Sequence, residues 1–420
     1  MTIKLKLTAT RFIRKYGTDW NDISDIFIIN LEGTNLSKVK FPNDPDFFQK
    51  VHNKSISNTI MPPLDYSIYN FNNVNFEKAR FHRDAILPKD TSLFQKIKNK
   101  SLEFCELPKG DYSNYNFTKV RLMHTKFTPD SIFSSDTEVF AKVYGSNITG
   151  TSLPKGDYSN YNCTNVLFQN VVFTKDSTFI QDITCFTKMK NKSILGCTLP
   201  NGDYSNYIFK DVNIQGLKLA YNSKLPTERT LFQKIKNKSL RRATLPKSDF
   251  SKFDFTDVKI INTTFTHDSI LPSNIFSVCW KQTASKCTLP EMDYSSFNFK
   301  ECTLKYTKFP KNSILPSNPN LFVELKNSSI LGCTMPNIDY RIYNFKGVRI
   351  KKAIFHNNSI FPSCEQVLNS CSSFTGAKIP QNSLENIHYV NKKLNKQFLK
   401  DNPISLESLY ILKKMDMIYI

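Results

Sequence analysis

Lysine is concentrated in short segments that recur along the chain, and clustered ammonium groups are the chemistry by which proteins bind polyanions. Lysine and arginine number 57 against 36 aspartates and glutamates, so the net charge is +21. We therefore consider nucleic acid and an anionic membrane surface as candidate partners, with a merely solvated surface as the alternative. The candidate residues are Lys96, Lys98, Lys100, Lys188, Lys190, Lys192, Lys234, Lys236, Lys238, Arg241 and Arg242.

The other reactive side chains do not form a recognisable catalytic or metal site. The six histidines are scattered, and no HExxH, GxSxG or glycine-rich phosphate loop is present. Aspartate recurs at seven equivalent positions, of which Asp111 is one. Catalysis needs one special site, so these aspartates are expected to stabilise turns. We predict no enzymatic activity, no cofactor and no bound metal.

An internal repeat must position the lysine segments. Heptapeptides of the type Asp-Tyr-Ser-Asn-Tyr-Asn-Phe recur with steps of 46, 46, 46, 46, 44 and 46 residues. A degraded eighth copy begins at Ser383. The seven clear copies begin at Asp65, Asp111, Asp157, Asp203, Asp249, Asp293 and Asp339.

A finer period of five residues lies inside each copy. It matches neither the 3.6-residue period of a helix nor the two-residue period of a flat strand, and predicts a backbone that turns every five residues. In the second copy the large apolar residues are Leu102, Leu107, Tyr112, Phe117, Leu122, Phe127 and Ile132, and the first and seventh copies end their series on Ile86 and Ile360. A second column, two residues before one of these steps, holds small side chains and predicts a packed interior. Its members are Thr59, Cys105, Thr151, Cys197, Ala243, Cys287, Cys333 and Ala377.

This pattern resembles the pentapeptide-repeat family, whose motif is a small residue, Asp or Asn, a large apolar residue and two variable ones. Matching stretches are Thr34-Asn35-Leu36, Gly110-Asp111-Tyr112 and Thr151-Ser152-Leu153. The resemblance covers roughly residues 26–404 and implies a mainly β fold, a right-handed four-sided β-helix with one pentapeptide on each side. Some family members imitate DNA and bind gyrase, but that needs an acidic rod, and a net charge of +21 argues against it. Others are effectors that bacteria inject into host cells as docking scaffolds.

The repeat arithmetic predicts where the remaining residues go. Seven sides use about 35 of the 46 residues, and segments such as 87–101 and 133–147 replace the eighth side. We expect one short helix in each of eight units, all on one edge, because each unit then makes two complete coils. A solenoid of paired helices is disfavoured by the density of Asn, Asp, Pro and Thr. The predicted parts are an N-terminal cap at 1–25, the solenoid at 26–404 and a capping helix at 405–420, whose end is alternatively a homodimer contact.

Two further features bear on chemistry. The four cysteines of the small column are predicted to pack without disulfides, since they lie two or more coils, or ~10 Å or more, apart, and a reducing compartment is expected. The position before the central Phe often holds an aromatic residue, for which we expect either a widened coil or a ring turned outward. Outward rings would give nucleic-acid bases a stacking platform. The recurring Asn-Lys-Ser sequons at Asn53, Asn99, Asn191 and Asn237 are interpreted as part of the structural repeat.

These observations predict a non-enzymatic, rod-like binding scaffold. The favoured hypothesis is a secreted bacterial effector that docks an unknown protein partner. The alternative is polyanion binding through a lysine ridge on the inserted segments. The segment MTIKLKLTATRFIRKYG is basic and lacks the apolar core of a Sec-type signal sequence, so we expect a cytoplasmic protein, or one secreted without such a signal into a host cytoplasm.

Overall fold

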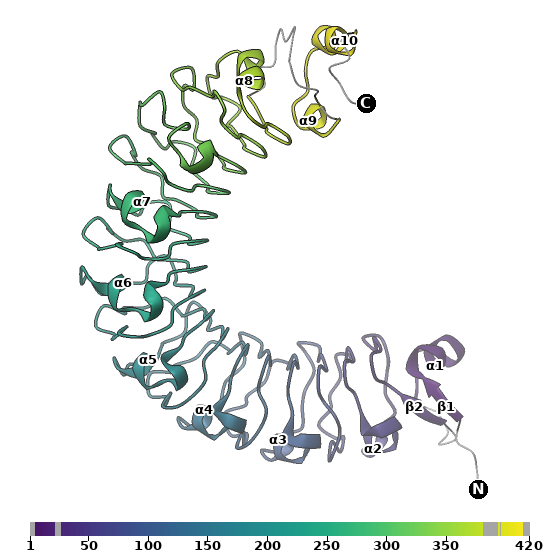
Figure 1. The fold of residues 1–420 in the computed structure, drawn as a ribbon. Helices are drawn as coiled ribbons and strands as arrows, with labels where there is room; N and C mark the ends of the chain where they lie inside the picture. The colour runs from purple at the N-terminus through teal and green to yellow at the C-terminus, as the bar shows by residue number, and fades with distance from the viewer. Residues whose placement is uncertain (1–4, 22–26, 381–393, 395, 415–420) are drawn as a thin grey trace. The chain divides into compact units, whose positions relative to one another are not determined.

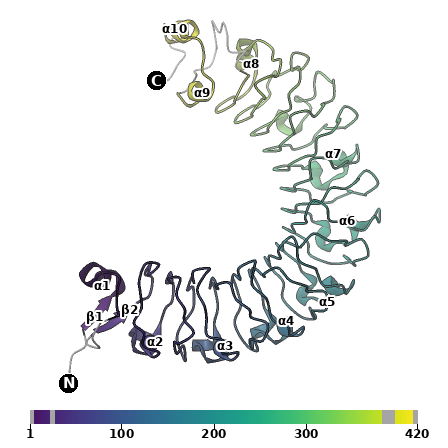
Figure 2. The same ribbon diagram turned by 180° about the vertical axis from the view of Figure 1, so that it is seen from behind.

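The computed structural model consists of two compact units of coiled chain (Figures 1 and 2). One unit comprises Met1–Gly202 and Asn206–Ile208, and the other Asp203–Ser205 and Phe209–Ile420. The structure describes residues 5–21, 27–380, 394 and 396–414.

The first unit begins with a small parallel sheet and a helix. Strands β1 (Leu5–Thr8) and β2 (Phe27–Asn30) pair from Leu5 opposite Phe27 to Thr8 opposite Asn30. Helix α1 (Ala9–Tyr16) starts where the Thr8 hydroxyl accepts a hydrogen bond from the Arg11 N–H at 3.4 Å. Its buried Phe12 packs on the buried Trp20, whose ring lies 5.7 Å from that of Phe41 in the adjoining chain. An apolar cluster therefore covers the start of the first coils.

Successive coils are joined by isolated parallel bridges, and shorter coils alternate with longer ones. Ile60 pairs with Arg80 across a shorter coil, and Arg80 pairs in turn with Glu106 across a longer one. One repeat therefore spans two bridge intervals. In the second unit one of the longer intervals, from Thr264 to Thr288, contains fewer residues than the interval from Arg80 to Glu106. The shorter repeat step thus trims the longer coil and leaves the number of coils unchanged.

The longer coil of most repeats carries a one-turn helix followed by a 3-10 turn, and within each unit these helices lie along one side of the coils (Figure 1). In the inserted segment 87–101 the Asp90 carboxylate accepts from the Ser92 N–H at 2.9 Å and shapes the approach to the helix. Ser92, the residue directly before the helix, makes no side-chain cap. The first unit contains α2 (Phe47–Lys50), η1 (His52–Lys54), α3 (Leu93–Lys96), η2 (Lys98–Lys100), α4 (Val139–Lys142), η3 (Tyr144–Ser146), α5 (Cys185–Lys188) and η4 (Lys190–Lys192). The second unit contains α6 (Leu231–Lys234), η5 (Lys236–Lys238), α7 (Ile275–Val278), η6 (Trp280–Gln282), η7 (Lys326–Ser328) and α8 (Cys364–Ser370).

Two more helices follow near the C-terminus of the second unit, α9 (Lys396–Asp401) and α10 (Leu406–Lys414). The solenoid was predicted to extend to residue 404, whereas the structure has helix α9 at Lys396–Asp401 within that range. Helix α10 lies within the segment 405–420 for which a helix was predicted. The degraded copy at Ser383 and the suggested dimer contact at 417–420 lie outside the described residues.

The five-residue columns form the core, with one correction. In the second repeat the first six members, from Leu102 to Phe127, are at most 4% exposed. The seventh was predicted to be buried, but Ile86, Ile132 and Ile360 are 50%, 56% and 47% exposed. On this side of the coil, both the small buried residue and the large core residue come one position later than the five-residue period predicts. The side chain that enters the core is therefore the next one, which is Leu87 in the first repeat.

The small column is buried as predicted, and its chemistry explains which residues alternate in it. All eight members are 0% exposed. The Thr151 hydroxyl and the Cys105 thiol donate to the carbonyl oxygens of Leu122 and Phe76, at 2.7 and 2.8 Å. Thr and Cys are thus small donors to the preceding coil, and the described cysteines are free thiols. Burial raises the pKa of the Cys287 thiol to about 12, which keeps it protonated.

The aromatic residues before the central Phe do not turn outward, so that alternative is wrong. Tyr69 is 7% exposed and Tyr343 is 6% exposed. The Tyr115 hydroxyl donates to the Pro88 carbonyl oxygen at 2.6 Å, and its ring lies 5.1 Å from that of Phe94. The side chains of this column pack between coils, so they do not form a row of exposed stacking platforms. Parallel bridges and buried columns are compatible with a right-handed four-sided β-helix, but that class stays a prediction.

Candidate functional site

The inserted segments hold the predicted lysines on an anchored turn. In α3, Phe94 is buried, and the Gln95 side-chain amide donates to the carbonyl oxygens of Asn116 and Thr118 at 2.9 and 2.8 Å. The following turn η2 has Asn99 in the left-handed region, with φ 56°. The lysines on either side of Asn99 are therefore held at the surface by a fixed backbone.

The left-handed turn also explains the recurring sequon. Asparagine tolerates this backbone conformation better than most residues, and glycine adopts it freely. Gly145 takes the position in η3, whereas Lys281 takes it in η6 with φ 51°. The other five turns use Asn53, Asn99, Asn191, Asn237 and Asn327.

The first lysine of each predicted trio is neutralised within its own segment. The Lys96 ammonium lies 2.7 Å from the Asp90 carboxylate, and Lys188 lies 2.7 Å from Asp182. Lys234 pairs with Glu228 in the same way. Hydrogen bonds from Lys96 and then Ser92 lower the pKa of Asp90 to about 2. These lysines contribute far less positive potential than the composition suggests.

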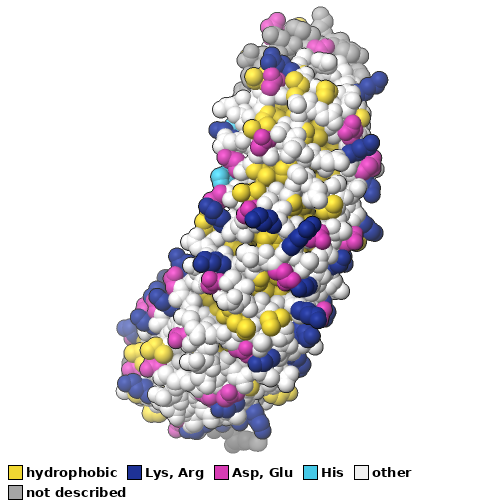
Figure 3. Space-filling model, turned by 90° about the vertical axis from the view of Figure 1, so that its left-hand side faces the viewer, with side chains coloured by type: hydrophobic (Ala, Val, Ile, Leu, Met, Phe, Trp, Pro, Cys, Tyr) yellow, Lys and Arg dark blue, Asp and Glu magenta, His cyan; other side chains and the backbone are white. Residues whose placement is uncertain are grey.

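The predicted ridge is therefore interrupted. Lys98, Lys190 and Lys236 are exposed, and no ion pair to any of them occurs within the described part of the chain. The Lys100 ammonium is half-buried and donates to the Gln95 side-chain oxygen at 2.7 Å. On the face drawn in Figure 3, cations and carboxylates alternate and no unbroken positive stripe is seen. The remaining predicted residues, Lys192, Lys238, Arg241 and Arg242, lie at the surface, with Lys238 half-buried.

The second unit instead gathers three cations around one indole. The Lys281 ammonium lies 4.8 Å from the centre of the Trp280 ring, and the Lys259 ammonium lies 5.5 Å from it. The Arg241 guanidinium lies 5.6 Å from the same centre. Within the described residues none of the three cations has a carboxylate partner. We call these four residues the Trp280 cluster.

Three neighbouring coils position the Trp280 cluster. A parallel bridge joins Ser239 and Lys259, which places Arg241 and Lys259 on adjacent coils. The Trp280 N–H donates to the Val258 carbonyl oxygen at 3.1 Å and fixes the turn η6 against the middle coil. Lys281 has a left-handed φ of 51°, as do lysines at several other turns, so this conformation belongs to the repeat and not to the cluster alone.

An equivalent cluster in the first unit is electrically neutral. Arg121 lies 4.0 Å from the centre of the Tyr144 ring, which is 51% exposed. Its guanidinium also lies 3.7 Å from the Glu103 carboxylate. The position of Glu103 is held by Arg241 in the second unit, so a carboxylate that neutralises the first cluster is a further cation in the other. We call Glu103, Arg121 and Tyr144 the Tyr144 cluster.

Sequence reasoning found Arg241 but missed Trp280, Lys259 and Lys281. Two signals were present in the chain. It has two tryptophans, and Trp280 stands where Lys98, Lys190 and Lys236 stand in other repeats. Lys259 escaped notice because it lies on a coil without an inserted segment, and only bridge pairing brings it beside Arg241.

The seven repeated aspartates act as predicted. The Asp111 carboxylate accepts from the Ser113 N–H at 2.9 Å, and Asp293 accepts from Ser295 at 2.8 Å. The hydrogen bonds from Ser113 lower the pKa of Asp111. Among the described residues, no group of three or more His, Cys, Asp or Glu is placed to hold a metal ion. No helix in this part of the chain is both long and apolar enough to cross a bilayer.

Comparison with known proteins adds little. No family model matches the sequence, and no curated protein matches it. Among solved structures, a match is found to HetL, a pentapeptide-repeat protein involved in the regulation of heterocyst differentiation in the cyanobacterium Nostoc. The alignment covers 89% of this chain and 86% of HetL, with 9% identity and a TM-score of 0.10. A TM-score this low supports no structural argument, so the family resemblance continues to depend on the repeated residues.

Proposed function

We propose that the protein is a non-enzymatic binding scaffold with a right-handed four-sided β-helix fold, and that the Trp280 cluster binds a polyanion. The fold proposal is supported by parallel bridges that alternate between shorter and longer intervals and by buried columns with a five-residue period. A scaffold is favoured over an enzyme because the repeat presents many equivalent surfaces. Among the described residues, the proposed function is assigned to the Trp280 cluster, which differs in charge from the equivalent Tyr144 cluster.

The observation that carries the binding proposal is a set of three cations around a single indole, none with a carboxylate partner among the described residues. Cations without carboxylate partners release counterions when they meet phosphates, which is the main source of polyanion affinity. An aromatic face adds stacking with a base, and the long side chains of Lys259 and Lys281 can swing away from the ring to contact phosphates. A membrane headgroup region would use the charges but not the stacking. We therefore favour single-stranded nucleic acid as the ligand.

Tryptophan fluorescence provides a direct test, because the other tryptophan, Trp20, is fully buried in the first unit. Single-stranded oligothymidylate should quench the emission of Trp280 at low salt. The apparent affinity should fall steeply with salt, with a slope of about −0.7 for each phosphate neutralised. Trp280→Phe should abolish the quenching signal and weaken binding modestly in a filter assay.

A charge-matched pair of variants separates the cluster from net charge. Reversing Arg241, Lys259 and Lys281 to Glu should weaken binding at least about 10-fold. Lys142 pairs with Asp136 at 2.7 Å, as Lys96 and Lys188 pair with their own carboxylates. Reversing Lys96, Lys142 and Lys188 to Glu changes the net charge equally and should weaken binding less than about 3-fold. Equal losses in both variants would mean that the whole surface attracts the oligonucleotide. Absence of binding by the unmodified protein at low salt would contradict the proposal outright.

The effector hypothesis, the protein partner and the compartment stay predictions. A protein-docking scaffold would leave the Trp280 cluster without a nucleic-acid role. Capture of one defined host protein in vitro, with no oligonucleotide binding, would favour that alternative.

A further inference from the structure

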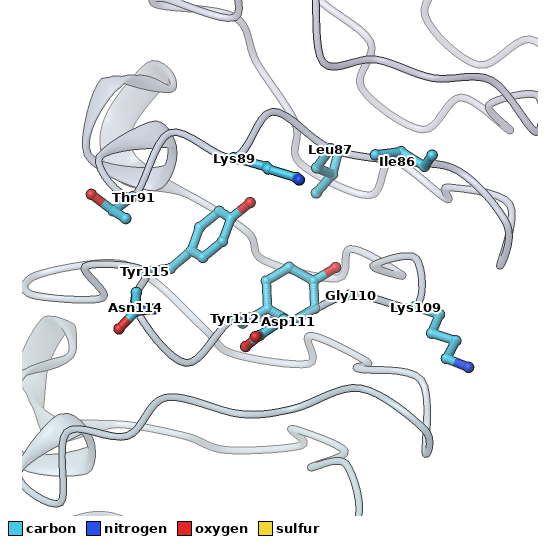
Figure 4. Close-up of a pocket in the computed structure, with 10 residues that line it drawn as sticks. All are labelled: Ile86, Leu87, Lys89, Thr91, Lys109, Gly110, Asp111, Tyr112, Asn114 and Tyr115. Atoms are coloured by element: carbon cyan, nitrogen blue, oxygen red, sulfur yellow. The ribbon is translucent and has the colours of Figure 1, made fainter.

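A hollow of about 420 Å³ lies between two consecutive repeats of the first unit. It is bounded by the chain from Ile86 to Thr91 on one side and from Lys109 to Tyr115 on the other. Figure 4 shows the rings of Tyr112 and Tyr115 between the two segments, with Lys89 along one rim and Lys109 directed away. Its volume lies within the range of about 300–1,000 Å³ that is typical of ligand pockets. We call it the inter-repeat slot.

The slot lies where two neighbouring coils separate between two backbone hydrogen bonds that join them, which we call the fixed points. At one end the Lys109 N–H donates to the Arg83 carbonyl oxygen at 2.9 Å. At the other the Asn116 N–H donates to the Thr91 carbonyl oxygen at 2.8 Å. The Tyr115 hydroxyl, which donates a hydrogen bond to the Pro88 carbonyl oxygen on the opposite rim, closes that end. The opening is therefore held by hydrogen bonds at both ends.

Both rims carry backbone groups without partners. Ile86 uses its N–H and C=O on the preceding coil, where it bonds to Leu64 and Tyr66. The other rim is the chain around Asp111. Its edge facing away from the slot is already hydrogen-bonded to Ile132, through Gly110 and Tyr112. The alternating geometry of a parallel ladder directs the N–H and C=O of Leu87 and Asp111 towards the slot. Within the described segments 83–91 and 109–116, no hydrogen bond to either N–H or either C=O occurs.

The same pair of fixed points recurs in both units, so the backbone arrangement around the slot belongs to the repeat. In the first unit the next pair of fixed points is Lys155 with Pro129 and Asn162 with Thr137. In the second unit one pair is Lys247 with Tyr221 and Asp254 with Arg229. Asp157 and Asp249 each stand at the rim between the two fixed points, as Asp111 does.

The rims specify the chemistry of an occupant. Each rim offers one donor and one acceptor, spaced as along an extended chain, so the matching ligand must carry donors and acceptors on both of its edges. An extended peptide does this, and strand addition to unpaired sheet edges is an established mode of peptide recognition. The bonded edge of the repeated aspartate shows which neighbour is favoured: Ile stands opposite five of the seven aspartates, Thr178 opposite Asp157 and Lys224 opposite Asp203.

We propose that the inter-repeat slot binds an extended peptide segment of a partner protein, with β-branched residues alternating along it, as an added strand between two coils. This inference is independent of the Trp280 cluster. The peptide's backbone pairs with Leu87 on one rim and Asp111 on the other. Apolar contact comes from the side chain of Ile86, which is 50% exposed.

The test uses the blocked tetrapeptide acetyl-Thr-Ile-Thr-Ile-amide as the probe and the full-length protein labelled with ¹⁵N-leucine and ¹⁵N-aspartate. The Leu87 and Asp111 amide resonances should shift together during the titration, with one midpoint in the millimolar range expected of a short peptide. The same peptide with N-methyl groups on alternate residues keeps its side chains but loses the donors on one edge. It should bind at least about 10-fold more weakly.

Three variants make the test specific. Asp111→Pro removes the unpaired N–H without breaking a backbone hydrogen bond that the structure contains, and should weaken binding at least about 10-fold. Asp111→Ala is the matched control, because it also loses the carboxylate but keeps the N–H, and should change binding less than about 2-fold. Gly110→Met should fill the slot, and Met292, at the same place before Tyr294, shows that the repeat accepts this side chain.

The outcomes separate the proposal from its rivals. No shift at millimolar peptide, or equal shifts with the N-methylated peptide, would overturn it. Equal loss in Asp111→Pro and Asp111→Ala would assign the effect to the carboxylate and overturn it as well. Self-association in sedimentation that is lost in Asp111→Pro, without peptide binding, would make a second copy of the chain the occupant.

Discussion

The Tyr144 cluster and the Trp280 cluster have the same backbone arrangement but different charge: the first is neutral and the second is positive. In both, a bridge joins the coils beneath the ring, from Ser101 to Arg121 and from Ser239 to Lys259. In both, the aromatic residue's N–H donates to the middle coil, at 3.0 Å to Val120 and at 3.1 Å to Val258. Two charged positions differ: Glu103 in one corresponds to Arg241 in the other, and Gly145 corresponds to Lys281. A repeat therefore keeps its fold while a few surface residues decide whether a cluster attracts anions.

The largest effect should come from the core beneath the two clusters and should be similar for both. Phe140 in α4 and Phe276 in α7 are each 0% exposed. Truncating either to Ala should lower the free energy of unfolding by about 3–5 kcal/mol, measured by urea denaturation. The loss should remain local, because repeats contact their neighbours. A much smaller loss for one of them would mean that packing as well as charge differs between the clusters.

Arg241→Glu should make the Trp280 cluster electrostatically similar to the Tyr144 cluster. The new carboxylate would neutralise Lys259 as Glu103 neutralises Arg121. We expect oligothymidylate affinity to fall about 10-fold and the salt slope to decrease by about one. The quenching titration at several salt concentrations measures both. Unchanged affinity would show that Lys259 and Lys281 suffice, so that position 241 does not distinguish the two clusters.

Glu103→Arg is the reciprocal change and should have a smaller effect. It frees Arg121 and adds a cation beside Tyr144, giving the first unit a second binding surface. Because the phenol ring stacks less extensively than indole, we expect only about a 3-fold gain in total affinity. Combining it with Arg241→Glu provides the control, since binding should then no longer quench Trp280. Quenching that persists in the double variant would argue against transfer of the site.

The smallest effect should come from the paired lysines. Because Lys96 holds the pKa of Asp90 at about 2, below the ordinary 3.8, the pair stabilises the fold above pH 3.8 and loses this contribution as the pH falls towards 2. The pair is exposed, so Asp90→Asn should lower stability by only about 0.3 kcal/mol at neutral pH, measured by thermal melting. Oligothymidylate binding should rise by less than about 2-fold. A larger rise would mean that the paired lysines are also part of the polyanion site.

Much of the interior followed from residue spacing. The small column was predicted from Thr59 to Ala377 and is buried throughout, because a slot of fixed volume admits few side chains. The phase shift at Ile86 could not be predicted, since Ile and Leu are adjacent there and either satisfies a hydrophobic pattern. Bridge formation with the preceding coil is what selects Leu87 for the core.

The candidate site was less predictable. The trio at Lys96 was visible in the sequence, but the carboxylate that neutralises it belongs to Asp90, ahead of α3, and pairs only after that helix forms. Lys259 and Trp280 are remote from each other in the sequence, and their separation has no meaning until the coil length is known. Tyr115 has the residue type of a stacking platform, yet its hydroxyl is bonded to Pro88.

The sequence by itself determined the repeat, the buried columns and the places where inserted segments interrupt them, because period and volume are local properties of the chain. Tertiary structure alone decided which cations are neutralised, which aromatic ring meets them and where two coils part to leave Leu87 and Asp111 unpaired. Ring contacts and ladder edges depend on residues that lie a whole coil apart in the chain. Such neighbours exist only once the coils are stacked.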